Sequence, residues 1–312
     1  MTIKRLAFIS ILLTYFLIVF GGYVASSNSG MGCGPEWPLC NGDVVPVLKG
    51  DTLIEFTHRV IGAVLGFISI ILFFKLIRAK VDYTARFAAF SMLVLLTIQV
   101  LLGAVVVLRD LPSIIITIHL IIAMLFLACL IWIWRYPGLE AGSEKFEIPK
   151  RRNRGVTLHL IILLILLLFT LAFGAYIKHQ SYGLACGWLG CRQSSFPVTT
   201  PELLQTIHRG LAVLSAIYIL LLTFLAFSKG WGRSLQKRLT LCTLTVLFQL
   251  VIGAAVVVTF IDIPWAVLHL AVGTGLFAFI SEARVYAGHG AIKSSGSHMV
   301  NGKWHGGRNS LN

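Results

Sequence analysis

The stretch LIEFTHRVIGAVLGFISIILFF, at residues 53–74, has a counterpart in LLQTIHRGLAVLSAIYILLLTF, at residues 203–224. Each stretch places a His-Arg pair near its start and continues as an apolar run long enough to cross a bilayer as a helix. The histidines of the two pairs are His58 and His208. Two stretches that agree in this way indicate a duplicated helical unit.

The duplication includes four polar or small features at identical spacing: a first histidine, a glutamine, a Gly-Ala step and a second histidine. They are His58, Gln99, Gly103-Ala104 and His119 in the first copy, and His208, Gln249, Gly253-Ala254 and His269 in the second. In both copies the two histidines are 61 residues apart. This pattern predicts two equivalent sites, each holding an iron from both sides.

The composition excludes a soluble globular protein, because 57% of the 312 residues are hydrophobic and the mean hydropathy is +0.87. Eight apolar runs are long enough to span a membrane, at residues 6–24, 54–77, 86–108, 113–134, 157–177, 203–227, 239–259 and 263–283. We therefore predict an all-α membrane protein with eight transmembrane helices. They form two pseudo-symmetric four-helix bundles, which an even number of helices per copy relates as a parallel internal repeat.

The same pattern divides the chain into four parts. Residues 1–135 form the N-terminal four-helix half and 155–285 the C-terminal half, separated by a cytoplasmic linker at 136–154. Residues 286–312 form a flexible tail, in which Gly296-Ser297-His298-Met299 resembles a remnant of cloning. We therefore leave His298 and His305 out of any site.

The formal net charge of +14 suggests nucleic-acid binding, but the distribution of the charges argues against it. Basic residues gather at the N-terminus, in the tail and in every second connection, at 75–86, 135–156 and 228–238. This alternation follows the positive-inside rule and predicts that both termini are cytoplasmic. The charge is then an orientation signal, with some attraction to anionic membrane lipid, and no nucleic-acid partner is expected.

Four cysteines lie in the two long outer loops, as Cys33 with Cys40 and Cys186 with Cys191. That compartment permits disulfides, which would stiffen the loops. Zinc binding is the less favoured alternative, because neither spacing is the short hook typical of zinc sites.

The four repeated histidines are expected at similar depth, roughly 7–10 Å below the outer ends of their helices. Two imidazoles at matched depth on different helices suit axial ligation of a heme between them; the alternative is hydrogen bonding to a neighbouring helix. Gln99 and Gln249 could bind a ligand or bridge helices. Arg59 and Arg209 could reach heme propionates or lipid headgroups.

Glu55 is the most informative difference between the copies, because its counterpart is Gln205. It precedes His58 by three residues, so both side chains share one helix face. A carboxylate near a heme can take up protons or stabilise a cation, which an amide cannot do. This favours the first copy for chemistry and the second for a fixed redox group. The alternative is that Glu55 only caps the first turn of its helix.

These residues together resemble the heme A synthase family, over nearly the whole chain to about residue 285. The resemblance includes the Gly21-Gly22 step, the loop Cys33-Gly-Pro-Glu-Trp-Pro-Leu-Cys40, Glu55-Phe-Thr-His58-Arg59 and Thr206-Ile-His208-Arg209. The paired-cysteine loops are similar to the bacterial form of the family, which implies a multi-pass protein of the bacterial cell membrane.

The resemblance implies an oxidoreductase that oxidises the C8 methyl group of heme O to the formyl group of heme A. By resemblance, His208 and His269 ligate the iron of a heme b cofactor, and electrons leave through it. His58 and His119 then bind the iron of the substrate or product heme, with Glu55 beside them as a catalytic residue. The cysteine pairs imply disulfides Cys33–Cys40 and Cys186–Cys191, the first with a redox role as an open alternative. The implied partners are the heme O synthase, a farnesyltransferase, and downstream cytochrome oxidase assembly.

Two other functions compete with this one. A diheme cytochrome that carries electrons, for example from quinol, usually stacks its hemes across the bilayer, whereas all four histidines here lie on the outer side. A heme transporter or chaperone needs a path through the membrane, and no charged residues at mid-helix depth are available to line one.

Overall fold

The computed structural model describes residues 1–139, 154–187, 191 and 197–289. The long helices are α1 (Ile3–Ser26), α2 (Gly50–Arg78), α3 (Tyr83–Leu108), α4 (Ser113–Arg135), α5 (Arg154–His179), α6 (Thr200–Ser228), α7 (Arg233–Val258) and α8 (Ile263–His289), with a short 3-10 helix at Pro137–Leu139. Within the described part of the chain, eight helices are long and apolar enough to cross a membrane. The prediction of an all-α membrane protein with eight spans is confirmed. Most of the proposed linker and tail lies outside the described residues, but residues 286–289, assigned from the sequence to the tail, continue α8.

Several helix starts are set by local capping. The Asp82 side chain accepts a hydrogen bond from the backbone N–H of Ala85 at 2.8 Å and so begins α3. Thr199 and Glu202 form a capping box at the start of α6, where Glu202 accepts from the backbone N–H of Thr199 at 3.1 Å. These caps satisfy N–H groups that the first helical turn leaves without partners.

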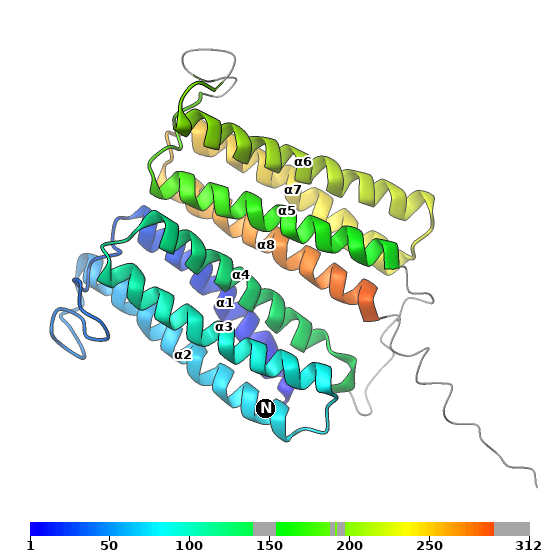
Figure 1. Ribbon diagram of the computed structural model, residues 1–312, viewed down its shortest axis with the longest axis horizontal. Helices are drawn as coiled ribbons and strands as arrows, with labels where there is room; N and C mark the ends of the chain where they lie inside the picture. Colours follow the sequence, from blue (N-terminus) through cyan, green and yellow to red (C-terminus); the bar gives the residue numbers. More distant parts are fainter. Residues whose placement is uncertain (140–153, 188–190, 192–196, 290–312) are drawn as a thin grey trace, which may run out of the picture.

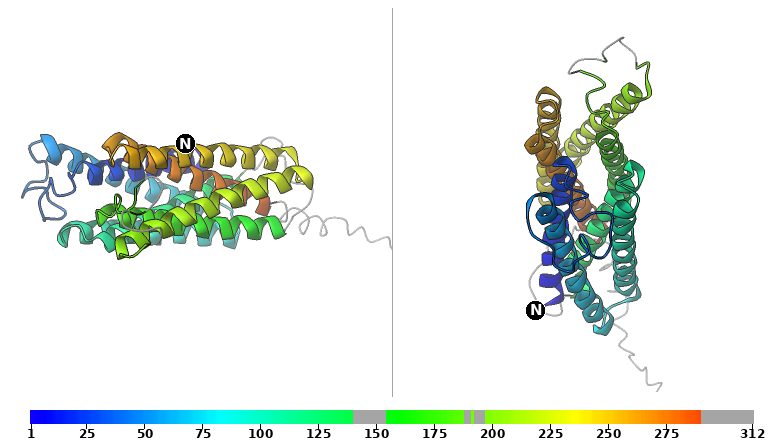
Figure 2. Two further views of the ribbon diagram at one scale, coloured as in Figure 1. Left: turned by 90° about the horizontal axis from the view of Figure 1, so that it is seen from above. Right: turned by 90° about the vertical axis from the view of Figure 1, so that its left-hand side faces the viewer.

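The helices pack side by side in two groups of four (Figure 1). In the N-terminal group α1 contacts α2 and α4, and α3 contacts α2 and α4; α5 to α8 repeat this closed ring of neighbours. The groups meet where α1 and α4 pack against α8, and α4 also packs against α5. Figure 2 shows that the long axes of both groups run along the same direction.

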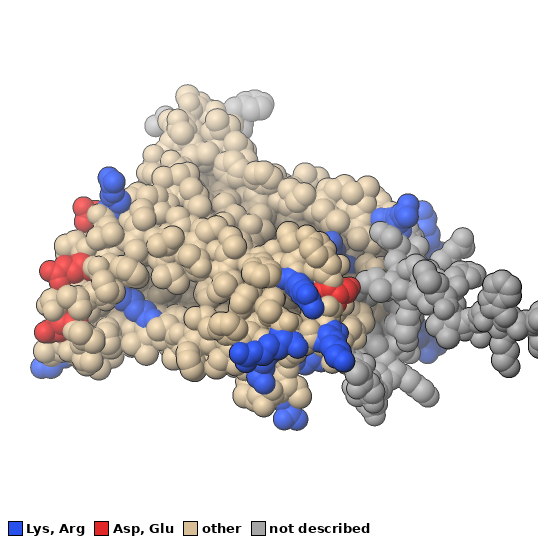
Figure 3. Space-filling view, turned by 60° about the horizontal axis from the view of Figure 1, so that its bottom comes forward, with Lys and Arg blue, Asp and Glu red and all other residues tan. Residues whose placement is uncertain are grey.

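The surface matches a protein surrounded by lipid. Large apolar side chains face outward from the membrane-spanning helices, for example Phe67 and Phe224, each 66% exposed. Buried hydroxyl groups such as that of Ser69 donate to a carbonyl of their own helix, which satisfies them without water. On the face shown in Figure 3, basic side chains gather at one end of the bundle and most acidic ones at the other, with an uncharged band between.

Candidate functional site

The four repeated histidines lie near the same end of the bundle, at which the cysteine loops emerge. His58 and His208 are each the ninth residue of their helices, α2 and α6. His119 and His269 are each the seventh residue of α4 and α8. These positions are about 12 Å and about 9 Å from the helix ends. The first pair is deeper than expected, because polar residues such as Gly50 to Thr52 extend α2 beyond the apolar run.

The two histidines of each copy lie on diagonal helices of one four-helix ring. Helices α2 and α4 are diagonal in the first ring, and α6 and α8 are diagonal in the second, because each contacts the same two neighbours. His58 and His119 nevertheless lie close enough to interact electrostatically, and so do His208 and His269. The structure therefore brings together the two histidines of each copy inside one bundle.

Each histidine is oriented by a contact from another helix. The imidazole Nδ1 of His208 is 2.9 Å from the carbonyl oxygen of Thr170 on α5, and His58 makes a backbone hydrogen bond with Leu17 on α1. These contacts fix the ring and leave its other nitrogen for a ligand, an arrangement typical of metal-binding histidines. The sequence did not predict that the first helix of each group, α1 or α5, would orient a histidine.

The glutamines hold the second histidine of each copy. Gln99 Nε2 lies 3.0 Å from His119 Nε2, and Gln249 Nε2 lies 3.2 Å from His269 Nδ1 and 3.0 Å from the His269 carbonyl oxygen. Both glutamines therefore bridge the third and fourth helices of their group, the alternative favoured from the sequence. The buried Oε1 atoms of both glutamines and His119 Nδ1 have no hydrogen-bond partner. Buried polar atoms without partners indicate a place for a polar or metal-containing ligand.

Glycines provide the flat walls beside the imidazoles. A Cβ atom built on Gly21 would lie 3.1 Å from His58 Nε2, and one on Gly174 would lie 2.8 Å from His208 Cε1. Gly103 and Gly253 stand in the same way against His119 and His269, at 3.4 and 3.0 Å. A side chain at Gly21, Gly174 or Gly253 would crowd the ring, whereas a Cβ at Gly103 would only touch it. Paired imidazoles, glycine walls and partnerless polar atoms fit a porphyrin held between two histidines.

Glu55 does not cap an exposed turn, because it is only 4% exposed. Its Oε2 accepts a hydrogen bond from the backbone N–H of Cys33 at 2.8 Å, and its Oε1 forms an ion pair with Arg59 at 2.5 Å. Arg59 also donates to the carbonyl oxygen of Leu39 at 2.9 Å. The carboxylate therefore connects the His58 helix to the outer loop.

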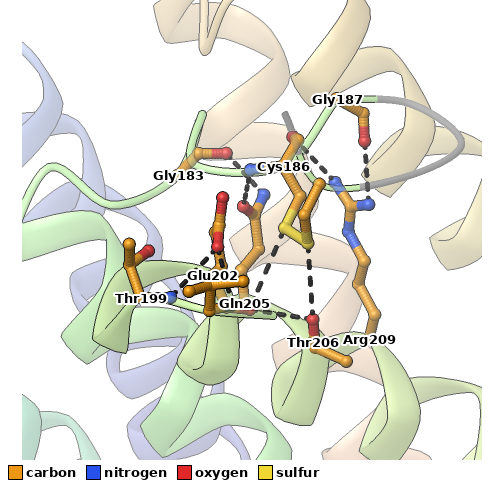
Figure 4. The surroundings of a disulfide bond; sticks show 10 residues. Gly183, Cys186, Gly187, Thr199, Glu202, Gln205, Thr206 and Arg209 are labelled. Carbon is orange, nitrogen blue, oxygen red and sulfur yellow. Dashed lines mark hydrogen bonds between the residues drawn. A yellow bond between two sulfur atoms is a disulfide. The ribbon is translucent and has the colours of Figure 1, made fainter. Parts of the chain in front are cut away.

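The second copy uses the same positions with different chemistry (Figure 4). Gln205 Oε1 accepts from the backbone N–H of Cys186 at 2.6 Å, and its Nε2 donates to the carbonyl oxygen of Gly183 at 2.6 Å. Arg209 donates to the carbonyl oxygen of Gly187 at 2.9 Å. Both arginines thus bind the outer loops. These loop contacts were not predicted from the sequence, and contact with propionates or headgroups stays a prediction.

Both expected cysteine pairs are disulfides, Cys33–Cys40 with an S–S distance of 2.01 Å and Cys186–Cys191 with 2.13 Å. Among the described residues no group of three or more His, Cys, Asp or Glu side chains is placed to hold a metal ion. A closed zinc site, which needs four such ligands, is therefore not formed there. Two-histidine axial coordination of a heme iron needs no such group.

The fold and the buried side chains define a class: a multi-pass helical membrane protein with one pair of facing histidines in each four-helix group. The chain matches the model of the cytochrome oxidase assembly protein family, COX15-CtaA, over residues 4–52 and 47–281, and it belongs to that family.

Curated relatives agree with this assignment and carry the name heme A synthase. The protein from Exiguobacterium sp. (strain ATCC BAA-1283 / AT1b) is 28% identical over 304 residues, covering 96% of this chain and 98% of its own length. The one from Shouchella clausii is 30% identical over 267 residues, covering 83% and 87%, and the one from Bacillus licheniformis is 28% identical over 283 residues, covering 86% and 90%. The resemblance found in the sequence is confirmed.

Proposed function

We propose that the protein is an oxidoreductase of heme A biosynthesis, which oxidises the C8 methyl group of heme O to the formyl group of heme A. Membership of the family, relatives named heme A synthase along nearly the full chain, and eight membrane-spanning helices support this activity. The structural observation that best supports this activity is an asymmetry. The two histidine sites are otherwise matched, but only one of them has a carboxylate.

The two halves have different functions, which correspond to the differences between their side chains. Residues 1–135 form the substrate half, in which His58 and His119 bind the iron of heme O or heme A. Residues 155–285 form the cofactor half, in which His208 and His269 hold heme b. When bound, heme b supplies one-electron redox chemistry. In the proposed parallel repeat both sites lie beneath the same membrane surface, and the positive-inside rule supports cytoplasmic termini and a cytoplasmic linker at 136–154.

Glu55 is the catalytic carboxylate of the substrate half. In the second stage of this conversion, the change from a hydroxymethyl group to a formyl group releases two protons and two electrons, and the electrons pass to an acceptor outside the substrate. Glu55 lies one helical turn from His58, and an oxygen of its carboxylate takes up such a proton. Arg59 and the N–H of Cys33 hold the carboxylate in position between turnovers. Gln205 provides the same loop contact without a proton-accepting group.

The substrate and product chemistry implies the partners. Heme O carries a farnesyl-derived chain, so a heme O synthase of the same membrane supplies it. Heme A is consumed by the assembly of cytochrome oxidases, which agrees with the description of the family.

The decisive experiment gives heme O to the purified protein in lipid nanodiscs and extracts the pigments after reaction. We expect a formylated heme from the wild-type protein and a strongly reduced yield, measured at the same reaction time, from Glu55→Gln. A diheme electron carrier would yield heme b and return the added heme O unchanged, and a transporter would also return heme O unchanged. Either result would reject the proposed activity.

A further inference from the structure

An apolar groove lies on the membrane-facing side of the junction between the two helix groups. It has a volume of about 480 Å³ and is lined mainly by α1, α7 and α8, including Leu12, Tyr15, Leu244, Phe248, Ala278 and Phe279. Leu244 is 61% exposed and Phe248 is 52% exposed, so the groove opens toward lipid. None of the four repeated histidines lines the groove. The groove lies where α1 and α8 pack together, and there Tyr15 donates a hydrogen bond to the carbonyl oxygen of Ala271.

A cluster of charged side chains lies on α1, α7 and α8, together with α4, near the end of the bundle opposite the histidines. Glu282 of α8 pairs with Arg135 of α4 at 2.6 Å and with Arg238 of α7 at 2.7 Å. Lys4 of α1 lies close enough to Arg135 to interact electrostatically with it. Among the residues that the structure describes, this cluster combines three cations with one carboxylate.

Helical periodicity puts the cluster and the groove on the same faces. Lys4 precedes the groove residue Ile11 by seven residues, and Arg238 precedes Thr245 by seven. Glu282 follows the groove residue Gly275 by seven. Seven residues are close to two turns and about 10 Å of rise, so each charged side chain lies directly beyond the groove on its own helix. The cluster therefore continues the line of the groove toward the ends of the same helices.

We propose that this surface binds an anionic phospholipid of the cytoplasmic leaflet. The phosphate contacts Lys4 and Arg238, and an acyl chain occupies the groove. Charge complementarity selects this occupant, because the excess of cations suits a phosphate at the membrane interface. An isoprenoid quinone or the chain of a heme would fill the groove without using the cations. The positions of the N-terminal half that correspond to Arg238 and Glu282 are Ala88 and Trp132, so duplication alone does not account for the cluster.

The test measures the retention of phosphatidylglycerol and of phosphatidylcholine by the purified full-length protein, using native mass spectrometry. Each basic side chain near an anionic surface contributes about fivefold in affinity, so Arg238→Gln should release phosphatidylglycerol about fivefold more readily. Glu282→Gln should have the opposite effect and strengthen retention. Lys237→Gln is the matched control, because it removes a neighbouring exposed charge from a different helix face.

A second variant separates lipid binding from simple stabilisation by the ion pairs. Gly275→Leu fills the groove and leaves the charges intact; a Cβ there lies 3.9 Å from Tyr15, so the position has room. We expect weaker retention of phosphatidylglycerol with an unchanged melting temperature. A photoactivatable acyl chain on phosphatidylglycerol should cross-link to α1, α7 or α8. Equal retention of both lipids, equal effects of Arg238→Gln and Lys237→Gln, or recovery of a quinone or heme chain from the groove would overturn the proposal.

Discussion

The two halves attach their outer loops to the histidine-bearing helix at the same position, three residues before the histidine. In the N-terminal half Glu55 accepts from the N–H of Cys33, and in the C-terminal half Gln205 accepts from the N–H of Cys186. The contact is therefore independent of charge. Because an amide is sufficient to hold the loop, the loop contact alone does not explain the negative charge of Glu55. That charge forms the ion pair with Arg59, and the proposed chemistry would also use it.

The walls around the histidines also differ between the halves. In the N-terminal half, Cβ atoms built on the two wall glycines would lie 3.1 Å from His58 and 3.4 Å from His119. In the C-terminal half, the corresponding distances are 2.8 Å to His208 and 3.0 Å to His269. The C-terminal glycines therefore lie slightly closer to their imidazole rings. We predict from this that the C-terminal pair is the more tightly enclosed, as suits a group that stays bound rather than a substrate that enters and leaves.

The largest expected effects come from removing the histidines. We predict that His208→Ala or His269→Ala purifies without heme b, whereas His58→Ala and His119→Ala keep heme b but convert no heme O, because each pair ligates a different iron. Absorbance spectra and extraction of the pigments measure both outcomes. His159→Ala is the control, since this histidine contacts Tyr218 Oη at 2.7 Å, away from the four. Full heme b content in His208→Ala would refute the division of the halves.

The exchange of Glu55 and Gln205 tests the charge difference itself. Glu55→Gln should lower the rate of heme O conversion by about 10²–10⁴-fold, the range for loss of a general acid or base. It should still fold, because glutamine holds the equivalent loop in the other half. Gln205→Glu should change the rate by only a few fold. Heme b absorbance confirms the integrity of both variants, and a wild-type rate for Glu55→Gln would exclude a catalytic role.

The glutamines should matter less than the histidines they contact. Gln249→Ala should weaken heme b binding, and Gln99→Ala binding of heme O, by about 10–100-fold, the usual effect of losing a group that orients a metal ligand. Titration of heme into the heme-free protein measures both affinities. Thr97→Val is a suitable control on α3, because its hydroxyl bonds only the carbonyl oxygen of Leu93 on the same helix. Equal weakening of both hemes by either variant would contradict separate sites.

Much of this arrangement could be predicted from the sequence, because it depends on local periodicity and spacing. The apolar runs gave the eight spans, and the repeat placed each histidine on its helix. The contacts of Glu55 and Arg59 could not be predicted, because they depend on where loop backbone N–H and C=O groups lie in space. The same holds for the ion pair between Arg135 and Glu282, which are far apart in the sequence and meet only when the two groups pack.

The smallest expected effects, and the sharpest test of the difference in enclosure, come from adding one methyl group to each wall. In Gly174→Ala the new Cβ would lie 2.8 Å from His208, so the ring must shift; overpacking of this kind costs about 1–3 kcal/mol. Gly103→Ala meets His119 at 3.4 Å, and the higher helix propensity of alanine offsets the crowding. We therefore expect Gly174→Ala to lower heme b affinity about tenfold and Gly103→Ala to leave heme O conversion near wild type. Spectral titration and the conversion assay measure these effects, and the reverse order would show that the N-terminal site is the tighter one.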